Sequence, residues 1–138
     1  MKTYPCNSPQ AVAHVVSIAM LVDASYHPKE VSALDHARAF ERLGLSREEF
    51  LGIALDSFTT LMTSLRRPGP YGLLTGEEVD LVLDTVQDGA QRRLAFELVM
   101  ELLPADGQVR PVELALVHRL QERWEIGSGL DGARRVLH

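Results

Sequence analysis

Four carboxylate side chains stand at matched positions in this sequence and are its best candidates for chemistry. Two of them, Asp106 and Glu113, belong to the stretch PADGQVRPVE at residues 104–113. The other two, Asp23 and Glu30, stand 83 residues earlier with the same spacing. Carboxylate oxygens are the ligands that Ca²⁺ and Mg²⁺ prefer in proteins. The first hypothesis is therefore a divalent-metal site built from acidic loops.

A single acidic loop of this kind cannot hold calcium by itself. An EF-hand loop supplies oxygens from positions 1, 3, 5, 7, 9 and 12 of its twelve residues. If Asp106 occupies position 5, Glu113 falls on position 12. Positions 1 and 3 are then Leu102 and Pro104, which carry no side-chain oxygen. An autonomous EF-hand is excluded because too few ligands are present.

A metal site would therefore need both loops. If the loops meet, the four carboxylates pool around one divalent cation, which would be Ca²⁺ or Mg²⁺. Nitrogen donors from His14 and His27 would favour Zn²⁺ or another transition metal instead. Whether the loops meet is left open by the sequence.

The same residues also fit a role as helix caps. Pro28 and Pro111 suit the first position of a helix, which places Glu30 and Glu113 at the third. A glutamate there reaches back to the backbone N–H of the N-cap residue and favours the positive end of the helix dipole. The two aspartates can accept hydrogen bonds from loop N–H groups. All four carboxylates are then explained without an ion.

The elements that would position these residues are predicted to be helices, because strand-like alternation is almost absent. Ser46 with Glu49 and Thr75 with Glu78 form capping-box patterns. We expect one all-α domain over 1–138, built of six to seven helices in a bundle, with residues 1–7 as a mobile N-terminal segment. The expected helices are 9–22, 28–44, 46 to about 65, 75 to about 86, 90–103, 111–124 and a short one at 130–138.

Composition narrows the classes of function. The chain has 138 residues, 46% hydrophobic and 24% charged, with a net charge of −5, which is typical of a globular protein. Its basic pair Arg66-Arg67 is too small a footprint for nucleic acid. The apolar run 11–22 is too short to span a bilayer and is better explained as a buried helix. We expect a cytoplasmic protein that binds no nucleic acid and does not insert into membranes.

An internal repeat links the two halves of the sequence. A shift of 83 residues aligns an apolar helix, an acidic loop and a proline-started helix with a second copy of the same unit. The identical pairs are Asp23 with Asp106, Pro28 with Pro111, Glu30 with Glu113 and Gly44 with Gly127. Because these identities coincide with expected helix boundaries, a duplication is favoured over chance.

The second copy carries a pattern similar to that of a known family. It reads A-D-G-x-apolar-x-x-x-E, with Gly107 and Val109 between its carboxylates, and the first loop differs at Ala24 and Tyr26. Over roughly residues 11–127 the chain resembles the tellurite-resistance TerB-like domain family. The resemblance implies an all-α fold of two pseudo-symmetric halves, acidic loops that bind metal, and a role in tellurite resistance or a related bacterial stress response.

Two functions remain open, and neither is enzymatic. The sequence has no nucleophile in a catalytic setting, and GPYGLLTG at 69–76 does not match a phosphate-binding loop. The first function is a small bacterial stress-response module that binds a divalent ion (Ca²⁺, Mg²⁺ or Zn²⁺) through its acidic loops. The alternative is a metal-free interaction module that binds a protein partner or self-associates, and whose loops only cap helices.

Overall fold

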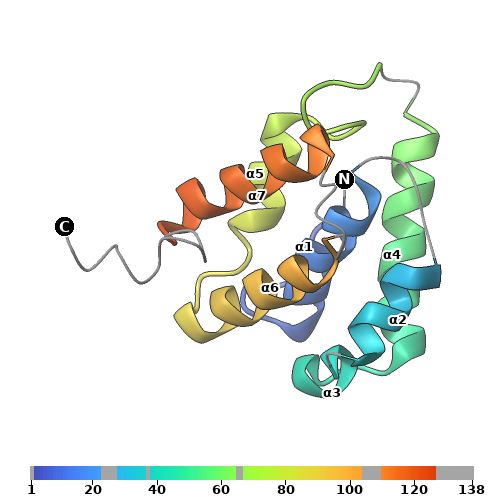
Figure 1. Cartoon of the computed structure of the whole chain (residues 1–138), viewed down its shortest axis with the longest axis vertical. Coiled ribbons are helices and arrows are strands. Elements are labelled where there is room, and N and C mark those ends of the chain that lie inside the picture. Colours follow the sequence, from blue (N-terminus) through green and yellow to red (C-terminus); the bar gives the residue numbers. More distant parts are fainter. Residues whose placement is uncertain (1, 23–27, 37, 65–66, 104–109, 127–138) are drawn as a thin grey trace.

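The structure is a computed structural model that describes residues 2–22, 28–36, 38–64, 67–103 and 110–126 (Figure 1). The described residues form seven helices and no strand, so the all-α fold class is confirmed. None of these helices is long and apolar enough to cross a membrane. The helices are α1 (Pro9–Leu21), α2 (Pro28–His36), α3 (Ala39–Leu43), α4 (Arg47–Met62), α5 (Gly76–Leu83), α6 (Gly89–Glu101) and α7 (Pro111–Trp124).

Helix α1 forms the centre of the core. It contacts α4 on one side and α5 and α6 on the other (Figure 1). Every side chain from Ala11 to Val22 is buried, which confirms the buried helix predicted for the apolar run. A helix that is apolar nearly all round is the kind that neighbours can enclose completely. The two polar side chains in this run, His14 and Ser17, are also buried, and the Ser17 hydroxyl donates to the Ala13 carbonyl at 2.8 Å.

The single helix predicted for residues 28–44 is wrong, because two helices occupy this range. Helix α2 ends at His36 and α3 begins at Ala39, with Arg38 in the left-handed region at φ 57°. Leu34 and Leu43 are both buried. At about 100° per residue they would face opposite sides of one straight helix. The break lets both reach the core, and Gly44 at φ 79° ends α3 as predicted.

Both predicted capping boxes are present. The Ser46 hydroxyl accepts from the Glu49 N–H and the Glu49 carboxylate accepts from the Ser46 N–H, each at 3.0 Å. Thr75 and Glu78 repeat the arrangement at 3.1 Å. These boxes start α4 and α5 where the sequence places them. Helix α6 is shifted slightly, to residues 89–101, because Asp88 caps it.

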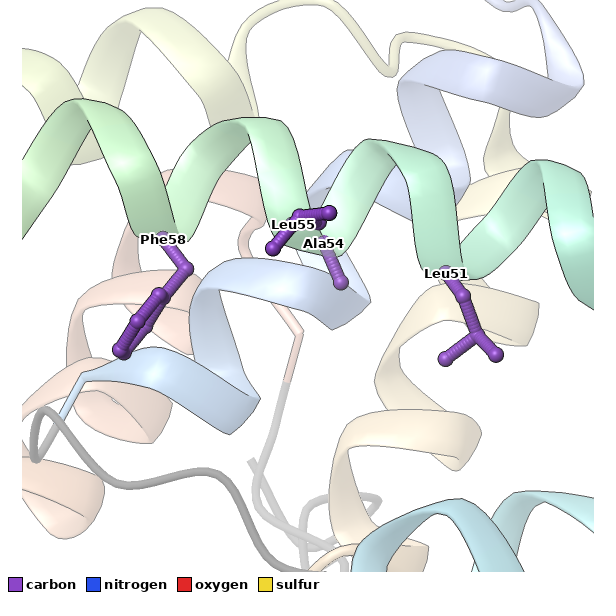
Figure 2. Close-up of a pocket in the computed structure, with 4 residues that line it drawn as sticks. All are labelled: Leu51, Ala54, Leu55 and Phe58. Atoms are coloured by element: carbon purple, nitrogen blue, oxygen red, sulfur yellow. The ribbon is translucent and has the colours of Figure 1, made fainter.

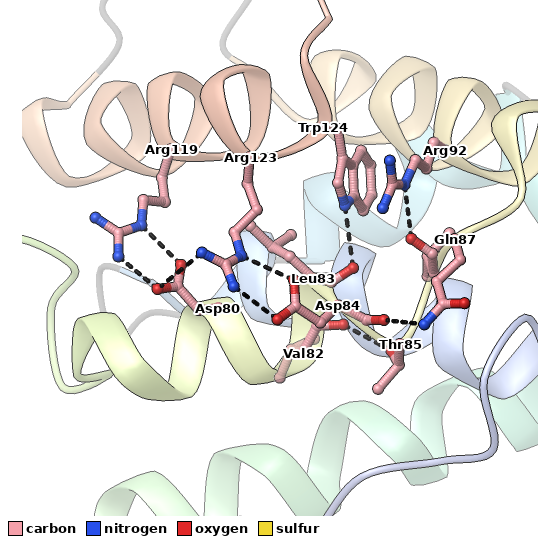
Figure 3. Close-up of polar contacts among 11 residues, drawn as sticks. Asp80, Val82, Leu83, Asp84, Thr85, Gln87, Arg92, Arg119, Arg123 and Trp124 are labelled. Carbon is pink, nitrogen blue, oxygen red and sulfur yellow. Dashed lines mark hydrogen bonds and ion pairs between the residues drawn. The ribbon is translucent and has the colours of Figure 1, made fainter.

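Two bidentate ion pairs join α5 to α7 (Figure 3). Arg119 donates to both carboxylate oxygens of Asp80 at 2.8 and 2.6 Å. Arg123 donates to both oxygens of Asp84 at 2.8 and 2.7 Å. The hydrogen bond from Arg119 holds the pKa of Asp80 below its ordinary value. Because every partner is engaged by another side chain, we interpret this cluster as a clamp between helices.

The pair between Asp80 and Arg119 is expected to couple by about 1 kcal/mol in a double-mutant cycle with Asp80→Asn and Arg119→Gln. Their side chains are 20% and 34% exposed, so solvent screens part of the attraction. Urea unfolding of the four proteins measures the coupling, which should shrink in 1 M NaCl. The matched control is the Arg38–Glu41 pair, 73% and 70% exposed, whose coupling should be near zero. Equal coupling in both pairs would contradict the clamp.

The segment before α1 contacts the rest of the domain through Tyr4 and Asn7. The Asn7 N–H donates to the Thr85 carbonyl at 2.7 Å, and its side-chain oxygen accepts from the Gln87 and Asp88 N–H groups at 2.7 and 2.9 Å. The Tyr4 ring meets the His14 ring edge to face, with centroids 5.2 Å apart. The sequence predicts a mobile segment over residues 1–7, whereas these contacts attach Tyr4 and Asn7 to the domain.

The loop between α4 and α5 lies against the end of α1. Gly72 has φ 63°, and a Cβ built on it would stand 1.7 Å from the Val22 carbonyl oxygen. Only glycine fits this close approach between two backbones. The contact is located where α1 ends, directly before the first acidic loop in sequence.

Candidate functional site

The four candidate carboxylates are only partly placed by the structure. Asp23 and Asp106 lie outside the described residues. Glu30 is the third residue of α2, and its side chain also lies outside the described part. Glu113 is the third residue of α7 and is half-buried. The cluster of four carboxylates therefore stays a prediction.

Glu113 has a clear local role as a helix cap. Its Oε1 accepts from the Arg110 N–H at 2.9 Å, while Pro111 opens the helix. This is the capping bond predicted from the spacing of proline and glutamate. One carboxylate oxygen is engaged in this way. Among the described residues, no group of three or more His, Cys, Asp or Glu side chains is arranged to hold a metal ion.

The helix ends beside the two acidic loops do come together. A small crevice is bordered by Ala19 near the end of α1, by Leu102 and Leu103 just after α6, and by Glu113 at the start of α7. In sequence, the first loop follows α1 and the second connects α6 to α7. The end of α1, just before the first loop, therefore lies beside both ends of the second loop, and Glu113 lies there.

His14, expected as a nitrogen donor, is not at this end of α1. It precedes Val22 by eight residues, which is about 12 Å along the helix axis. Its side chain is 1% exposed, and its Nδ1 has no hydrogen-bond partner in the described part of the chain. Burial lowers the pKa of His14 to about 4, partly opposed by Asp56. His27 lies outside the described residues.

An apolar groove runs along α4 and was not predicted from the sequence. Leu51, Ala54, Leu55 and Phe58 line a space of about 390 Å³. Figure 2 shows the side chains of Leu51 and Phe58 leaving the same side of α4. Leu55 is 65% exposed, and Met62, one turn beyond Phe58, is 51% exposed. We call the four residues Leu51, Leu55, Phe58 and Met62 the α4 stripe.

The α4 stripe borders the face that α4 turns to the core, and two of its members, Leu51 and Phe58, are half-buried against the core. Its members follow the spacing i, i+4, i+7 and i+11, which places them within an arc of about 60°. The core face is made by Phe50, Ile53, Ser57 and Leu61, all buried. The spacing of the sequence predicts one inward face made by Phe50, Ile53, Ala54, Ser57, Phe58, Leu61 and Leu65; five of these are buried, Phe58 is only half-buried, and Leu65 lies outside the described residues. A second apolar stripe on one helix was the signal that could have revealed the groove.

Comparisons with known proteins add no family to this description. A scan against protein-family models found no match, and searches of curated proteins and of solved structures found none either.

Proposed function

We propose that the protein is an interaction module that binds another protein through the groove on α4. The observation that carries this proposal is the α4 stripe itself. A soluble domain seldom leaves large apolar side chains together on one helix, and such patches commonly mark binding surfaces. Leu55 and Met62 have more than half of their surface in water although a core is available beside them.

The dimensions of the stripe suit a helical partner. From Leu51 to Met62 the stripe covers twelve residues, or about 16 Å of helix. A partner helix laid along it would present three turns of apolar side chains at i, i+4 and i+7 spacing. Burying a leucine or methionine side chain fully is worth about 1.5–3 kcal/mol. The stripe therefore offers enough apolar surface for specific, reversible binding.

Site-specific photocrosslinking in the host cells tests this function. A benzophenone amino acid at position 55 should crosslink to a discrete partner, identified by mass spectrometry, whereas one at Glu122, exposed on α7, should not. The purified partner should then bind the wild type but not Leu55→Asp, a substitution at an exposed position that leaves the core intact. Equal crosslinking from both positions would contradict the proposal.

A second candidate function is a divalent-metal module of the tellurite-resistance type. It is supported by the crevice where Ala19 and Glu113 lie together, because the end of α1, just before the first acidic loop, lies there beside both ends of the second. Asp23, Glu30 and Asp106 would join Glu113 as ligands for Ca²⁺, Mg²⁺ or Zn²⁺. The resemblance to the TerB-like family belongs with this candidate and stays a prediction.

Thermal unfolding of chelator-stripped protein separates the two candidates. Ca²⁺, Mg²⁺, Zn²⁺ and Mn²⁺ are added in turn to the wild type and to an Asp106→Asn/Glu113→Gln variant. Glutamine at position 113 can still accept the capping bond, so the variant removes charge and leaves the cap. A bound ion should raise the midpoint of the wild type alone. If no ion raises it, the metal candidate is wrong and Glu113 serves only as a cap.

A further inference from the structure

The N-terminal segment covers a buried histidine on the central helix. His14 lies on α1 with 1% of its surface exposed, and the Tyr4 ring meets it edge to face with centroids 5.2 Å apart. We propose that residues 2–6, which we call the N-terminal strap, swing away from α1 when His14 takes up a proton. This acid-operated release is independent of the groove on α4 and goes beyond the function proposed for that groove.

The environment of His14 suits a neutral ring and not a charged one. A neutral imidazole carries one donor and one acceptor nitrogen, whereas both nitrogens of the protonated ring donate. Nδ1 of His14 has no hydrogen-bond partner in the described part of the chain. A proton on this ring therefore places a charge in the core together with a donor at Nδ1 that has no acceptor. A buried charge without a partner is strongly unfavourable unless water reaches it.

The strap is the part of this enclosure that is easiest to remove. Tyr4 is half-buried, whereas the other four strap residues, Lys2, Thr3, Pro5 and Cys6, are exposed. Among the described residues, no hydrogen bond joins residues 2–4 to a helix. The rest of α1 is covered by helices packed along its length. Lifting the strap therefore takes one aromatic ring off His14 and leaves the packing of the helices unchanged.

Asn7 gives the strap a fixed hinge. Its N–H donates to the Thr85 carbonyl at 2.7 Å, and its own carbonyl accepts from Gln91 Nε2 at 2.8 Å. Its side-chain oxygen accepts from two backbone N–H groups just before α6. The next residue, Ser8, caps α1. Because the chain is anchored directly after the strap, residues 2–6 can move while α1 keeps its cap.

The groups around His14 favour release in acid. Burial is the main cause that lowers the pKa of His14 to about 4, Asp56 of α4 acts against it, and the positive amino end of the chain adds to it. Burial and Asp56 raise the pKa of Tyr4, so its phenol stays neutral in acid. Lys2 lies 5.3 Å from the centroid of the Tyr4 ring and leaves with it. Once the strap is off, water reaches His14 and the attraction of Asp56 is kept. The open state therefore binds the proton more tightly, and lowering the pH favours it.

Distances between nitroxide spin labels test the release. The chain has a single cysteine, so a Cys6→Ser background allows one label at Thr3→Cys on the strap and one at Glu122→Cys on α7, both exposed positions. Pulsed electron resonance should give one narrow distance at neutral pH and a growing broad component between about pH 6 and pH 4. A second pair, Arg93→Cys on α6 with Glu122→Cys, should keep its distance over this range because the helices stay packed. Loss of the second distance as well would mean unfolding and would overturn a local release.

Substitutions in the strap contact identify the group that responds to pH. His14→Leu cannot take up a proton, so its strap distance should stay narrow at every pH. Tyr4→Ala removes the ring that covers His14, so its distance should be broad even at neutral pH. The matched control His36→Gln removes an exposed histidine of α2 and should follow the wild type. A wild-type distance that stays narrow at pH 4, or that broadens equally in His14→Leu, shows that the release does not occur as proposed.

Proton NMR of the His14 ring provides a check that does not depend on the folding of the leucine variant. In Tyr4→Ala the pKa of His14 should move from about 4 toward 6.5, because water reaches the ring. An unchanged pKa would mean that Tyr4 does not enclose His14, and the strap would have no control over the proton. The groove function is tested at position 55, so failure of the strap leaves that function standing.

Discussion

Trp124→Ala is expected to lower the free energy of unfolding by about 3–5 kcal/mol, the range for losing a buried aromatic side chain. The indole is 4% exposed at the end of α7, and its Nε1 donates to the Leu83 carbonyl at 3.0 Å. The guanidinium of Arg92 lies 5.6 Å from the ring centroid (Figure 3). Alanine would leave a cavity where α5, α6 and α7 meet, and would leave the Leu83 carbonyl without this donor. Trp124 is the chain's single tryptophan, so the alanine variant has no tryptophan fluorescence. The loss is therefore measured by urea unfolding followed by circular dichroism at 222 nm.

Trp124→Phe separates the contribution of the ring from that of its N–H group. Phenylalanine keeps most of the apolar burial but cannot donate to Leu83, so the expected loss is about 1–2 kcal/mol. A loss under about 1 kcal/mol for the alanine variant would contradict the buried position of Trp124. The comparison therefore tests whether α7 is docked into the core at its C-terminal end.

Features that depend on neighbouring residues could be predicted from the sequence. The capping boxes at Ser46 and Thr75 join groups three residues apart, so the pattern contains the whole interaction. The same holds for Glu113, whose bond to the Arg110 N–H follows from the position of Pro111. These caps were predictable because their physics is local, although the Asp88 cap of α6, which is equally local, was not predicted.

Features that depend on distant contacts could not be predicted. The break at Arg38 exists because Leu34 and Leu43 must both reach the core, and nothing within 28–44 reveals where that core lies. The groove on α4 has the same origin. The pattern contains two apolar stripes, and only the placement of the neighbouring helices decides that Phe50, which packs against Phe40 of α3, is buried while Leu55 stays exposed.

The candidate metal site depends most strongly on contacts between residues that are distant in sequence. Its two halves are 83 residues apart, and a repeat in the sequence cannot establish that two loops meet in space. Convergence of Ala19 and Glu113 at one crevice comes from the way α1, α6 and α7 pack, which local patterns do not encode. The capping role of Glu113 was predictable from its spacing to Pro111, whereas an ion shared by both loops could be predicted only from the whole fold.

The free energy of unfolding is expected to decrease as the pH is lowered from about 6.5 to about 4, because the side chain of His14 on α1 is buried. Burial lowers its pKa from 6.5 to about 4. Below pH 6.5 the unfolded chain binds a proton that the folded protein does not accept, so acidification favours unfolding. The full difference corresponds to about 3 kcal/mol, at roughly 1.4 kcal/mol per pKa unit. Above pH 6.5 both states are neutral at this ring and His14 contributes no pH dependence.

The contribution of His14 is isolated by comparing the wild type with His14→Leu, since the many carboxylates of the chain also titrate on the acidic side. Urea unfolding at several pH values between 7.5 and 4 gives the difference in unfolding free energy between the two proteins. That difference should shift in favour of the leucine variant by about 3 kcal/mol as the pH falls. His118→Gln, at an exposed position on α7, controls for the removal of one histidine and should follow the wild type. Parallel profiles for wild type and His14→Leu would mean that the buried ring takes up its proton without opening the core around Tyr4 and α1.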